Sequence, residues 1–520
     1  MFWADKIAQE QKKSGQSQLV DDAKTPSGKI HVGALRGVII HDLAYKALTA
    51  AGIPARYTFI IDDLDPMDSL PVYLSSEKFE KYMGVPLKNI PAPQGSGSYA
   101  EYYAKEFIGV FNKLGANPEI LWNSLVYKEG KFDPYIKTAL DNAEKIQEIY
   151  EKISGSKRPK DYIPFQPICE NCGKIGTTAA TKWDGEYVDY ECQPNKVDWA
   201  VGCSHQGKAK PFGGTGKLPW RIEWPAKWAA LGVTVEGEGK DHASKGGSRD
   251  TANAIADEIF QIEPPYDIPY EHVLLSGQKM SSSKGVGVSA VEMAEILPLD
   301  VLRFLMVRFR PMQHIDFNPE IPHTLLKLFD DFDTARDSKD SDLKRIYELS
   351  NVSEKGQDYF VPRFRDLVNL IQMPQINSKP LAISEQLLEE VERLKGGKLT
   401  EGDEKALEER VKYVKIWLEK FAPEEAKFSV KKDLPLEAKD LTGKQKEFLT
   451  GVAQYLKEKD PEKFQNILYD ESKRFNLASE DAFKAIYLAF LGKDHGPKAA
   501  WLILSLDENF VKKRVQEVVE

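Results

Sequence analysis

The segment between residues 18 and 65 constrains the fold more than any other part of the chain. A strand-like stretch is followed by a Pro/Gly turn and then by a helix that we predict from about Val32 to Ala51, with Gly52 just beyond its end. The next stretch, Ala55–Ile61, is a run of β-branched and aromatic residues typical of a buried parallel strand. This strand–helix–strand pattern predicts an α/β fold with a doubly wound parallel sheet.

The rest of the chain must be divided among further domains. At 520 residues the chain is too long for one hydrophobic core, so we expect two to four domains. Residues 66–215 include Pro/Gly/Ser-rich and Cys/Gly-rich stretches, which predict an insertion, and we expect helices at 99–114 and 135–153. After about residue 320 the pattern is almost entirely helical, which predicts a domain boundary within 290–350 and an all-α region behind it.

Composition narrows the class of protein without revealing a function. A hydrophobic content of 42% and a charged content of 29% are typical of an ordinary globular protein. No apolar run is long enough to cross a bilayer, and the start of the chain lacks a secretory signal pattern, so we expect a cytoplasmic protein without a membrane partner. The net charge of −9 offers no support for nucleic-acid binding, so any such function must be argued from motifs.

Two short segments about 250 residues apart suggest phosphate chemistry. Residues 26–33 read PSGKIHVG, and residues 278–285 read QKMSSSKG. At the start of a helix, exposed backbone N–H groups attract anions, and glycines let a ligand approach the backbone. His31 could donate to a phosphate, while Lys279 and Lys284 could neutralise charge that develops on it. Each segment alone could be an ordinary polar turn, but the pair predicts a nucleotide site.

The four cysteines predict a metal site. Cys169 and Cys172 form a CxxC pair, and Cys192 and Cys203 follow within the same 35 residues. In a cytosolic protein this spacing favours a tetrahedral zinc site over disulfides, with reduced structural thiols as the alternative. Cys203 and His205 compete for the fourth position. Because four protein ligands leave no open position, we predict a structural role for the metal.

Two further segments combine aromatic and charged residues. Residues 218–228 read LPWRIEWPAKW, and residues 239–248 read GKDHASKGGS. Aromatic rings beside a carboxylate can hold a cationic group, although core packing is the alternative for most of these tryptophans. Asp62 and Asp65 follow the predicted strand at its carboxyl end, where doubly wound sheets bind ligands.

Taken together, these segments resemble class I lysyl-tRNA synthetases. The resemblance covers most of the chain and is most specific in TPSGKIHVG, LPWRIEWPAKW, GKDHASKGGS and KMSSSKG. It implies a Rossmann-type catalytic domain at 1–290 that carries the insertion, with a zinc knuckle at 165–210. It further implies a connecting helical domain at 291–350, similar to a stem-contact domain, and an all-α anticodon-binding domain at 351–520.

The implied activity is the ATP-dependent activation of lysine, assisted by Mg²⁺, and its transfer to tRNA(Lys). The structural Zn²⁺ would be held by Cys169, Cys172, Cys192 and Cys203, with His205 as the alternative fourth ligand. We expect a monomer. By resemblance the catalytic residues are His31, Lys279 and Lys284; ATP would contact Pro26, Ser27, Gly28, His31, Gly33, Lys279, Met280, Ser281, Ser282 and Ser283; lysine would contact Asp62, Asp65, Trp220, Asp241, His242 and Tyr270.

The chain departs from the family pattern at two places. Ala34 follows Gly33 where the family usually has His or Asn, which removes one polar contact to phosphate. Asp22 and Lys24 stand where the family generally has small, apolar residues. Two alternatives therefore stay open: another class I specificity, such as glutamate or arginine, and a non-catalytic relative that binds tRNA or lysine.

Overall fold

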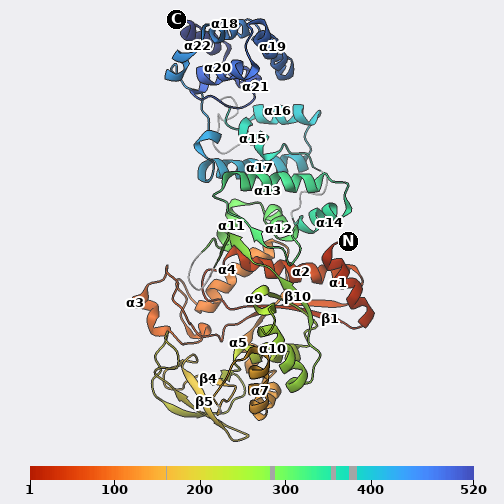
Figure 1. Cartoon of the computed structure of the whole chain (residues 1–520), viewed down its shortest axis with the longest axis vertical. Helices are drawn as coiled ribbons and strands as arrows, with labels where there is room; N and C mark the ends of the chain where they lie inside the picture. Colours follow the sequence, from red (N-terminus) through yellow and green to blue (C-terminus); the bar gives the residue numbers. More distant parts are fainter. Residues whose placement is uncertain (160, 281–286, 353–358, 374–382) are drawn as a thin grey trace. The chain divides into compact units, whose positions relative to one another are not determined.

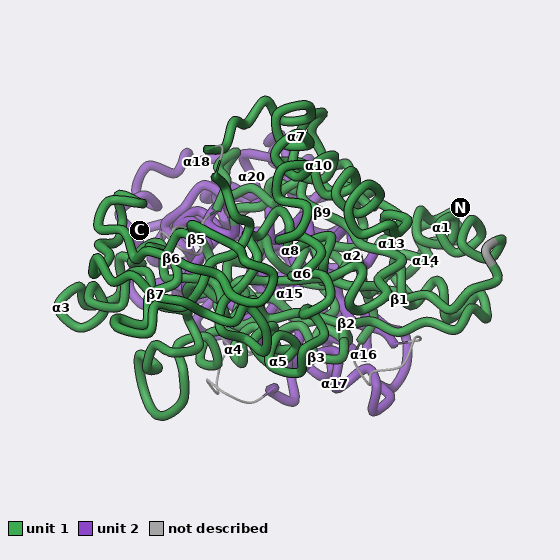
Figure 2. The backbone as a smooth tube through the Cα atoms, turned by 90° about the horizontal axis from the view of Figure 1, so that it is seen from below, with its two compact units in different colours: residues 1–318, 334–352 green, residues 319–333, 353–520 purple. Residues whose placement is uncertain are grey.

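The computed structural model describes residues 1–159, 161–280, 287–352, 359–373 and 383–520. These residues form two compact units, drawn in green and purple in Figure 2. Unit 1 comprises residues 1–318 and 334–352, and unit 2 comprises residues 319–333 and 353–520.

A five-stranded parallel sheet organises unit 1, which confirms the predicted doubly wound α/β fold. Its strands are β1 (Gln18–Lys24), β2 (Ala55–Ile61), β3 (Glu119–Trp122), β9 (Val235–Gly239) and β10 (Tyr266–Tyr270), in the order β10-β9-β1-β2-β3. The strand order reverses between β1 and β9. There the two strands pair only through Val20 and Asp21, whereas β1 pairs with β2 along its whole length. The strands β1 and β9 therefore part before their carboxyl ends, at the kind of position where such sheets bind ligands.

The predicted crossover helix is present as α2 (Leu35–Ala50), preceded by a 3₁₀ turn at Val32–Ala34. Most of its residues are buried, because α2 packs on β1, β2 and β9. Gly52 follows the helix with a φ of +77°, the left-handed conformation expected beyond a helix end.

The predicted insertion at 66–215 is interrupted by a part of the sheet domain. Helix α4 (Tyr99–Lys113), close to the helix predicted at 99–114, leads into the edge strand β3. This strand has only four residues, none of them fully buried, so it lacks the long apolar run that revealed β2. The helix predicted at 135–153 is two helices, α6 (Asp133–Asp141) and α7 (Ala143–Ser154), which meet at Asn142.

Unit 1 contains further helices and short strands, many of which are labelled in Figure 1. The insertion also contains α3 (Ser76–Phe79), α5 (Asn123–Lys128), the antiparallel pair β4 (Gln166–Pro167) and β8 (Gly216–Lys217), and an antiparallel sheet of β5 (Thr178–Trp183), β6 (Val188–Cys192) and β7 (Gln206–Ala209). The others are α1 (Trp3–Gln11), α8 (Trp220–Leu231), α9 (Lys240–Ala243), α10 (Ser248–Ile255) with a π-helical turn at Ala256–Phe260, β11 (Val273–Leu275), β12 (Gln278–Lys279), α11 (Ala290–Ile296), α12 (Leu299–Val307), β13 (Ile315–Asp316) and α14 (Ser341–Ser350).

Most of the range predicted as a connecting domain, 291–350, packs within unit 1. Arg303 on α12 is fully buried, and its guanidinium pairs with Asp42 on α2. The same guanidinium donates to the carbonyl oxygens of Leu114, at 2.8 Å, and Leu349, at 2.6 Å. One side chain thus ties α12 to α2, to the end of α4 and to α14.

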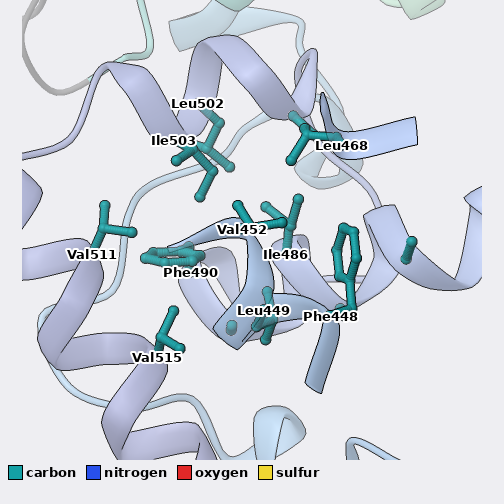
Figure 3. Packing of buried hydrophobic residues seen from close by; sticks show 14 of the residues in the cluster. Phe448, Leu449, Val452, Leu468, Ile486, Phe490, Leu502, Ile503, Val511 and Val515 are labelled. Atoms are coloured by element: carbon teal, nitrogen blue, oxygen red, sulfur yellow. The ribbon is translucent and has the colours of Figure 1, made fainter. Parts of the chain in front are cut away.

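The described part of unit 2 is helical, as predicted for the C-terminal region. Its core includes Phe448, Ile486 and Phe490, which are shielded from solvent and packed together (Figure 3). Within the described ranges, no helix is both long and apolar enough to span a membrane. The helices are α13 (Pro322–Arg336), whose residues from 334 onward are assigned to unit 1, α15 (Phe364–Leu370), α16 (Glu385–Lys395), α17 (Glu401–Lys420), α18 (Gly443–Val452), α19 (Pro461–Arg474), α20 (Ser479–Leu491), α21 (Ala499–Leu504) and α22 (Glu508–Val519).

Candidate active site

A cavity of about 540 Å³ lies in unit 1, between the carboxyl ends of the strands. Its lining includes the last residue of β1, Lys24, and the last residues of β9 and β10, Gly239 and Tyr270. Asp62, directly after β2, completes this edge. The cavity therefore occupies the position that the strand order predicts for a ligand.

The two predicted phosphate-binding segments meet at this cavity. His31 and Gly33 line it from the turn before α2, and Lys279 lines it from β12. The turn is held by backbone hydrogen bonds from Val32 N–H to Val288 O and from Ala290 N–H to Ile30 O, both 2.9 Å. The two segments, about 250 residues apart in the sequence, therefore lie side by side, as a shared nucleotide site requires.

Gly33 and Met280 pack closely around His31. A Cβ atom on Gly33 would lie 2.9 Å from His31 Nδ1 and 3.2 Å from Met280 Cε, so any other residue would displace the imidazole. Burial, together with the nearby positive charges of Lys24 and Lys279, lowers the pKa of His31 to about 3. The imidazole is therefore neutral at physiological pH, and it can still donate through one ring N–H.

Lys279 is held by a carboxylate across the cavity mouth. Its ammonium group pairs with Asp241 Oδ2, and His272 Nε2 lies 3.1 Å from Asp241 Oδ1. Hydrogen bonds from Lys279 and His272 lower the pKa of Asp241 to about 2. The Lys279 side chain remains 57% exposed, so it can exchange this partner for a ligand. Residues 281–284, predicted to complete the phosphate site, lie outside the described residues.

Asp62 and Asp65 line the cavity, but both carboxylates are already paired with lysines of the protein. Asp62 accepts hydrogen bonds from Lys227 Nζ and, at 3.1 Å, from Asn123 Nδ2. Asp65 pairs with Lys217 and accepts a hydrogen bond from Thr25. Both residues therefore lie at the cavity, with their negative charge compensated from within the chain.

Glu223 on α8 joins these pairs into one buried network. Its carboxylate lies 2.9 Å from Lys217 Nζ and accepts hydrogen bonds from Tyr127 Oη, at 2.7 Å, and Asn123 Nδ2, at 3.1 Å. Attraction from carboxylates, Asp65 and Asp62 foremost, outweighs burial and raises the pKa of both Lys217 and Lys227. Because Lys217 belongs to β8, which pairs with β4 of the insertion, the network fastens the insertion to the cavity wall.

Four cavity carboxylates were absent from the predicted lysine-binding set: Glu223, described above, and Asp22, Glu236 and Glu238. Glu236 Oε2 accepts hydrogen bonds from the indole N–H groups of Trp224, at 2.9 Å, and Trp228. Glu238 pairs with Arg249 at 3.2 Å, and burial raises its pKa to about 9. The sequence did contain a signal for Glu236 and Glu238, because they stand two residues apart in the short strand Val235–Gly239 and acidic residues are rare in buried strands.

Trp220, His242 and Tyr270, which were predicted to contact lysine, line the cavity. The His242 ring meets Trp220 and Trp224 edge-on, with centroid separations of 5.6 and 5.9 Å. A Cβ atom on Gly37 of α2 would lie 2.7 Å from Tyr270 Oη, so glycine at this position keeps space for the phenol.

Four of the predicted ATP contacts lie beside the cavity without lining it: Pro26, Ser27, Gly28 and Met280. The carbonyl oxygen of Ser27 accepts a hydrogen bond from Tyr99 Oη at 2.9 Å, which fixes the turn against α4. The Met280 side chain is buried against Gly33.

The four cysteines come together in the insertion. The sulfur atoms of Cys169, Cys172, Cys192 and Cys203 all lie within 4.8 Å of one another, and two of these distances are 3.6 Å. Tetrahedral coordination at a Zn–S distance of 2.3 Å requires sulfur–sulfur distances of about 3.8 Å, so the four thiols are close enough together to converge on one metal ion. The alternative ligand His205 instead contacts Glu170 Oε1 at 2.8 Å, which favours Cys203 as the fourth ligand.

Comparisons with known proteins agree on one family. A family model described as tRNA synthetases class I (K) matches residues 1–353. The chain is 36% identical to a lysine–tRNA ligase of Thermoplasma acidophilum, covering 100% of this chain and 99% of that protein. It is 39% identical to lysine–tRNA ligase 1 of Methanosarcina acetivorans, covering 99% and 98% respectively. The lysine–tRNA ligase of Archaeoglobus fulgidus is 37% identical over 99% of both chains.

Proposed function

The chain belongs to the class I tRNA synthetases (K), and we propose that its cavity forms lysyl-adenylate before lysine passes to tRNA(Lys). Its relatives are lysine–tRNA ligases along their whole length, so the chain is an enzyme that joins lysine to tRNA at the expense of ATP. The products are lysyl-tRNA, AMP and pyrophosphate. The same relatives disfavour glutamate or arginine specificity and a non-catalytic role.

The observation that supports this proposal is the meeting of His31 and Lys279 in one cavity that also carries several carboxylates. The first step requires a nucleophilic carboxylate of lysine, held in line with the α-phosphate of ATP. The ammonium group of Lys279 suits the triphosphate, and the carboxylates of the cavity suit a cationic amino acid.

Phosphate contacts are assigned to the two signature segments. Neutral His31 donates a hydrogen bond to a phosphate oxygen, and Lys279 leaves Asp241 to stabilise the negative charge that develops on the phosphates. The contributions of Ser281, Ser282, Ser283 and Lys284 remain part of the proposal on the basis of sequence. ATP enters as its Mg²⁺ complex, to which we assign no protein ligand.

Recognition of the lysine side chain is assigned to Glu236, flanked by Trp224, and to the aromatic wall of Trp220 and His242. Asp62 and Asp65 now have a different proposed role, because Lys227 and Lys217 compensate their charge. They hold the wall in place. A desolvated ammonium group needs a counter-charge, and Glu236 offers one without an ion-pair partner among the described residues.

We also propose that the four cysteines hold a structural Zn²⁺. Because all ligands come from the protein, the metal would stabilise the insertion and take no part in the reaction. Elemental analysis of freshly purified protein should find one zinc per chain. A metal-free protein with an intact fold would contradict this assignment.

For the tRNA, we propose that the helical region at 351–520 binds the anticodon and that residues 291–350 contact the stem. This assignment rests on the full-length relatives and on the helices of unit 2. A monomer in the cytoplasm, where ATP and tRNA are present, completes the proposal.

The decisive experiment is ATP–pyrophosphate exchange with each of the twenty amino acids. Lysine alone should support exchange, and lysyl-tRNA should form once tRNA(Lys) is added. Exchange that depends on glutamate or arginine would overturn the specificity. Binding of lysine without any exchange would identify a non-catalytic relative.

A further inference from the structure

Most charges of the cavity wall neutralise one another. Lysines and an arginine pair with most of its carboxylates, and apart from Lys279, whose exposed ammonium group can exchange Asp241 for a ligand, these charges are not available to a ligand. The compensated groups are Asp62 with Lys227, Asp65 and Glu223 with Lys217, Asp241 with Lys279, and Glu238 with Arg249.

Three charged groups of the wall are left over. Within the described ranges, Lys24 makes no hydrogen bond or ion pair through its ammonium group, and Asp22 and Glu236 have no lysine or arginine partner. The only ion-pair contact of Asp22 there is with His41 Nδ1, at 3.5 Å. His41 Nε2 accepts the N–H of Gly237 at 2.8 Å, and Nδ1 lies 2.7 Å from Gly37 O, so both ring nitrogens are engaged by the backbone at shorter distances than the contact with Asp22.

Asp22 and Lys24 stand two residues apart on β1, so their side chains project from the same face of the strand. Both line the cavity at the carboxyl end of the strand, where β1 has parted from β9. Lys24 is also close enough to His31 and Lys279 for its charge to influence both, which places it beside the proposed phosphate site.

We propose that Lys24 and Asp22 bind the α-carboxylate and the α-ammonium group of the substrate amino acid. Two uncompensated carboxylates and one uncompensated ammonium group match the two cations and one anion of free lysine, with Glu236 left for the ε-ammonium group. This assignment rests on the proposed function, and it adds the residues that recognise the part of lysine at which the reaction occurs.

The proposed contact with the substrate carboxylate explains why the Lys24 side chain has no partner among the described residues of the cavity wall. Burial lowers the pKa of Lys24, which reflects the cost of holding its charge away from water. A bound carboxylate removes this cost and is itself oriented towards the α-phosphate of ATP. Because hydrogen bonds between charged groups are the strong ones, loss of either contact should weaken lysine binding by about tenfold to a hundredfold.

The test compares lysine with two analogues that each lack one group. Cadaverine has no carboxylate, and 6-aminohexanoate has no α-amino group. Calorimetric titration of the full-length protein should show that Lys24→Met weakens binding of lysine by at least tenfold and leaves cadaverine binding unchanged. Asp22→Asn should weaken lysine binding and leave 6-aminohexanoate binding unchanged. Lys24→Arg should restore part of the loss.

A matched control is Lys240→Met. Lys240 belongs to the segment beside the cavity, but its ammonium group pairs with Glu271 at 2.8 Å, so lysine should bind this variant as it binds the wild type. Equal weakening of lysine and cadaverine by Lys24→Met, or a raised KM for ATP with unchanged lysine binding, would overturn the carboxylate assignment. Failure of the wild type to bind lysine would instead overturn the proposed function.

Discussion

At the scale of single residues, the identity of a side chain did not reveal which charges are free to act. Asp62 and Asp65 were predicted as ligands for a cation because they follow a central strand. Their partners Lys227 and Lys217 lie 165 and 152 residues away in the sequence, so the pairing could not be read from any local pattern. The position of these carboxylates at the end of the strand could be predicted from the sequence. Whether they are free to bind a ligand depends on ion pairs that form only in the folded protein.

Replacement of Lys279 by Ala should reduce lysine-dependent ATP–pyrophosphate exchange by at least about a hundredfold, because a charge that stabilises the transition state is lost. The free energy of unfolding should change little, since the side chain is largely exposed. The exchange rate measures the first effect and urea denaturation the second. A loss below about threefold would show that Lys279 does not contact the reacting phosphates.

The lowered pKa of His31 predicts a pH dependence of stability. An ordinary histidine has a pKa of 6.5, while that of folded His31 is about 3, so the unfolded chain binds the additional proton between these values. Stability contributed by neutral His31 is therefore fully present above pH 6.5 and falls as the pH is lowered towards 3. Urea denaturation at pH 7 and pH 5 should show a smaller loss for His31→Asn than for the wild type.

At the scale of elements, long and strongly patterned segments could be predicted, and short ones could not. The helix α2, the strand β2 and the glycine after α2 were found close to their predicted positions. Strand β3 was missed because its four residues are too few to show a pattern of alternating polar and apolar side chains. It is recognisable as a strand only through its pairing with β2. The break between α6 and α7 was missed because Asn142 carries no strong helix-ending signal.

Gly37 offers a prediction at the level of helix α2. Alanine at this position would favour the helix but would bring a Cβ atom within 2.7 Å of Tyr270 Oη, inside the cavity wall. Gly37→Ala should therefore raise the KM for lysine severalfold. Gly109→Ala in α4 is the matched control, because no atom lies within 4 Å of its added Cβ. It should stabilise the fold by about 0.5–1 kcal/mol without changing the KM.

At the scale of the whole molecule, the two compact units predict separable losses of function. Unit 2 has its own hydrophobic core, in which Phe490 is completely buried. Phe490→Ala should cost about 3–5 kcal/mol in the stability of this core. Attachment of lysine to tRNA should then fail at a temperature where ATP–pyrophosphate exchange continues. Leu436→Ala, at an exposed position, is the control. Simultaneous loss of both activities would contradict independent units.

The pairing of Asp62 and Asp65 has a consequence for an enzyme that must select free lysine. Every lysine of the chain carries the chemical group that the cavity is meant to recognise, and a tethered group competes at a high effective concentration. Lys227 and Lys217 already occupy the carboxylates of Asp62 and Asp65. Lysines of the folded chain thus occupy these carboxylates in place of the substrate. Only carboxylates that no lysine of the chain occupies can bind the free amino acid.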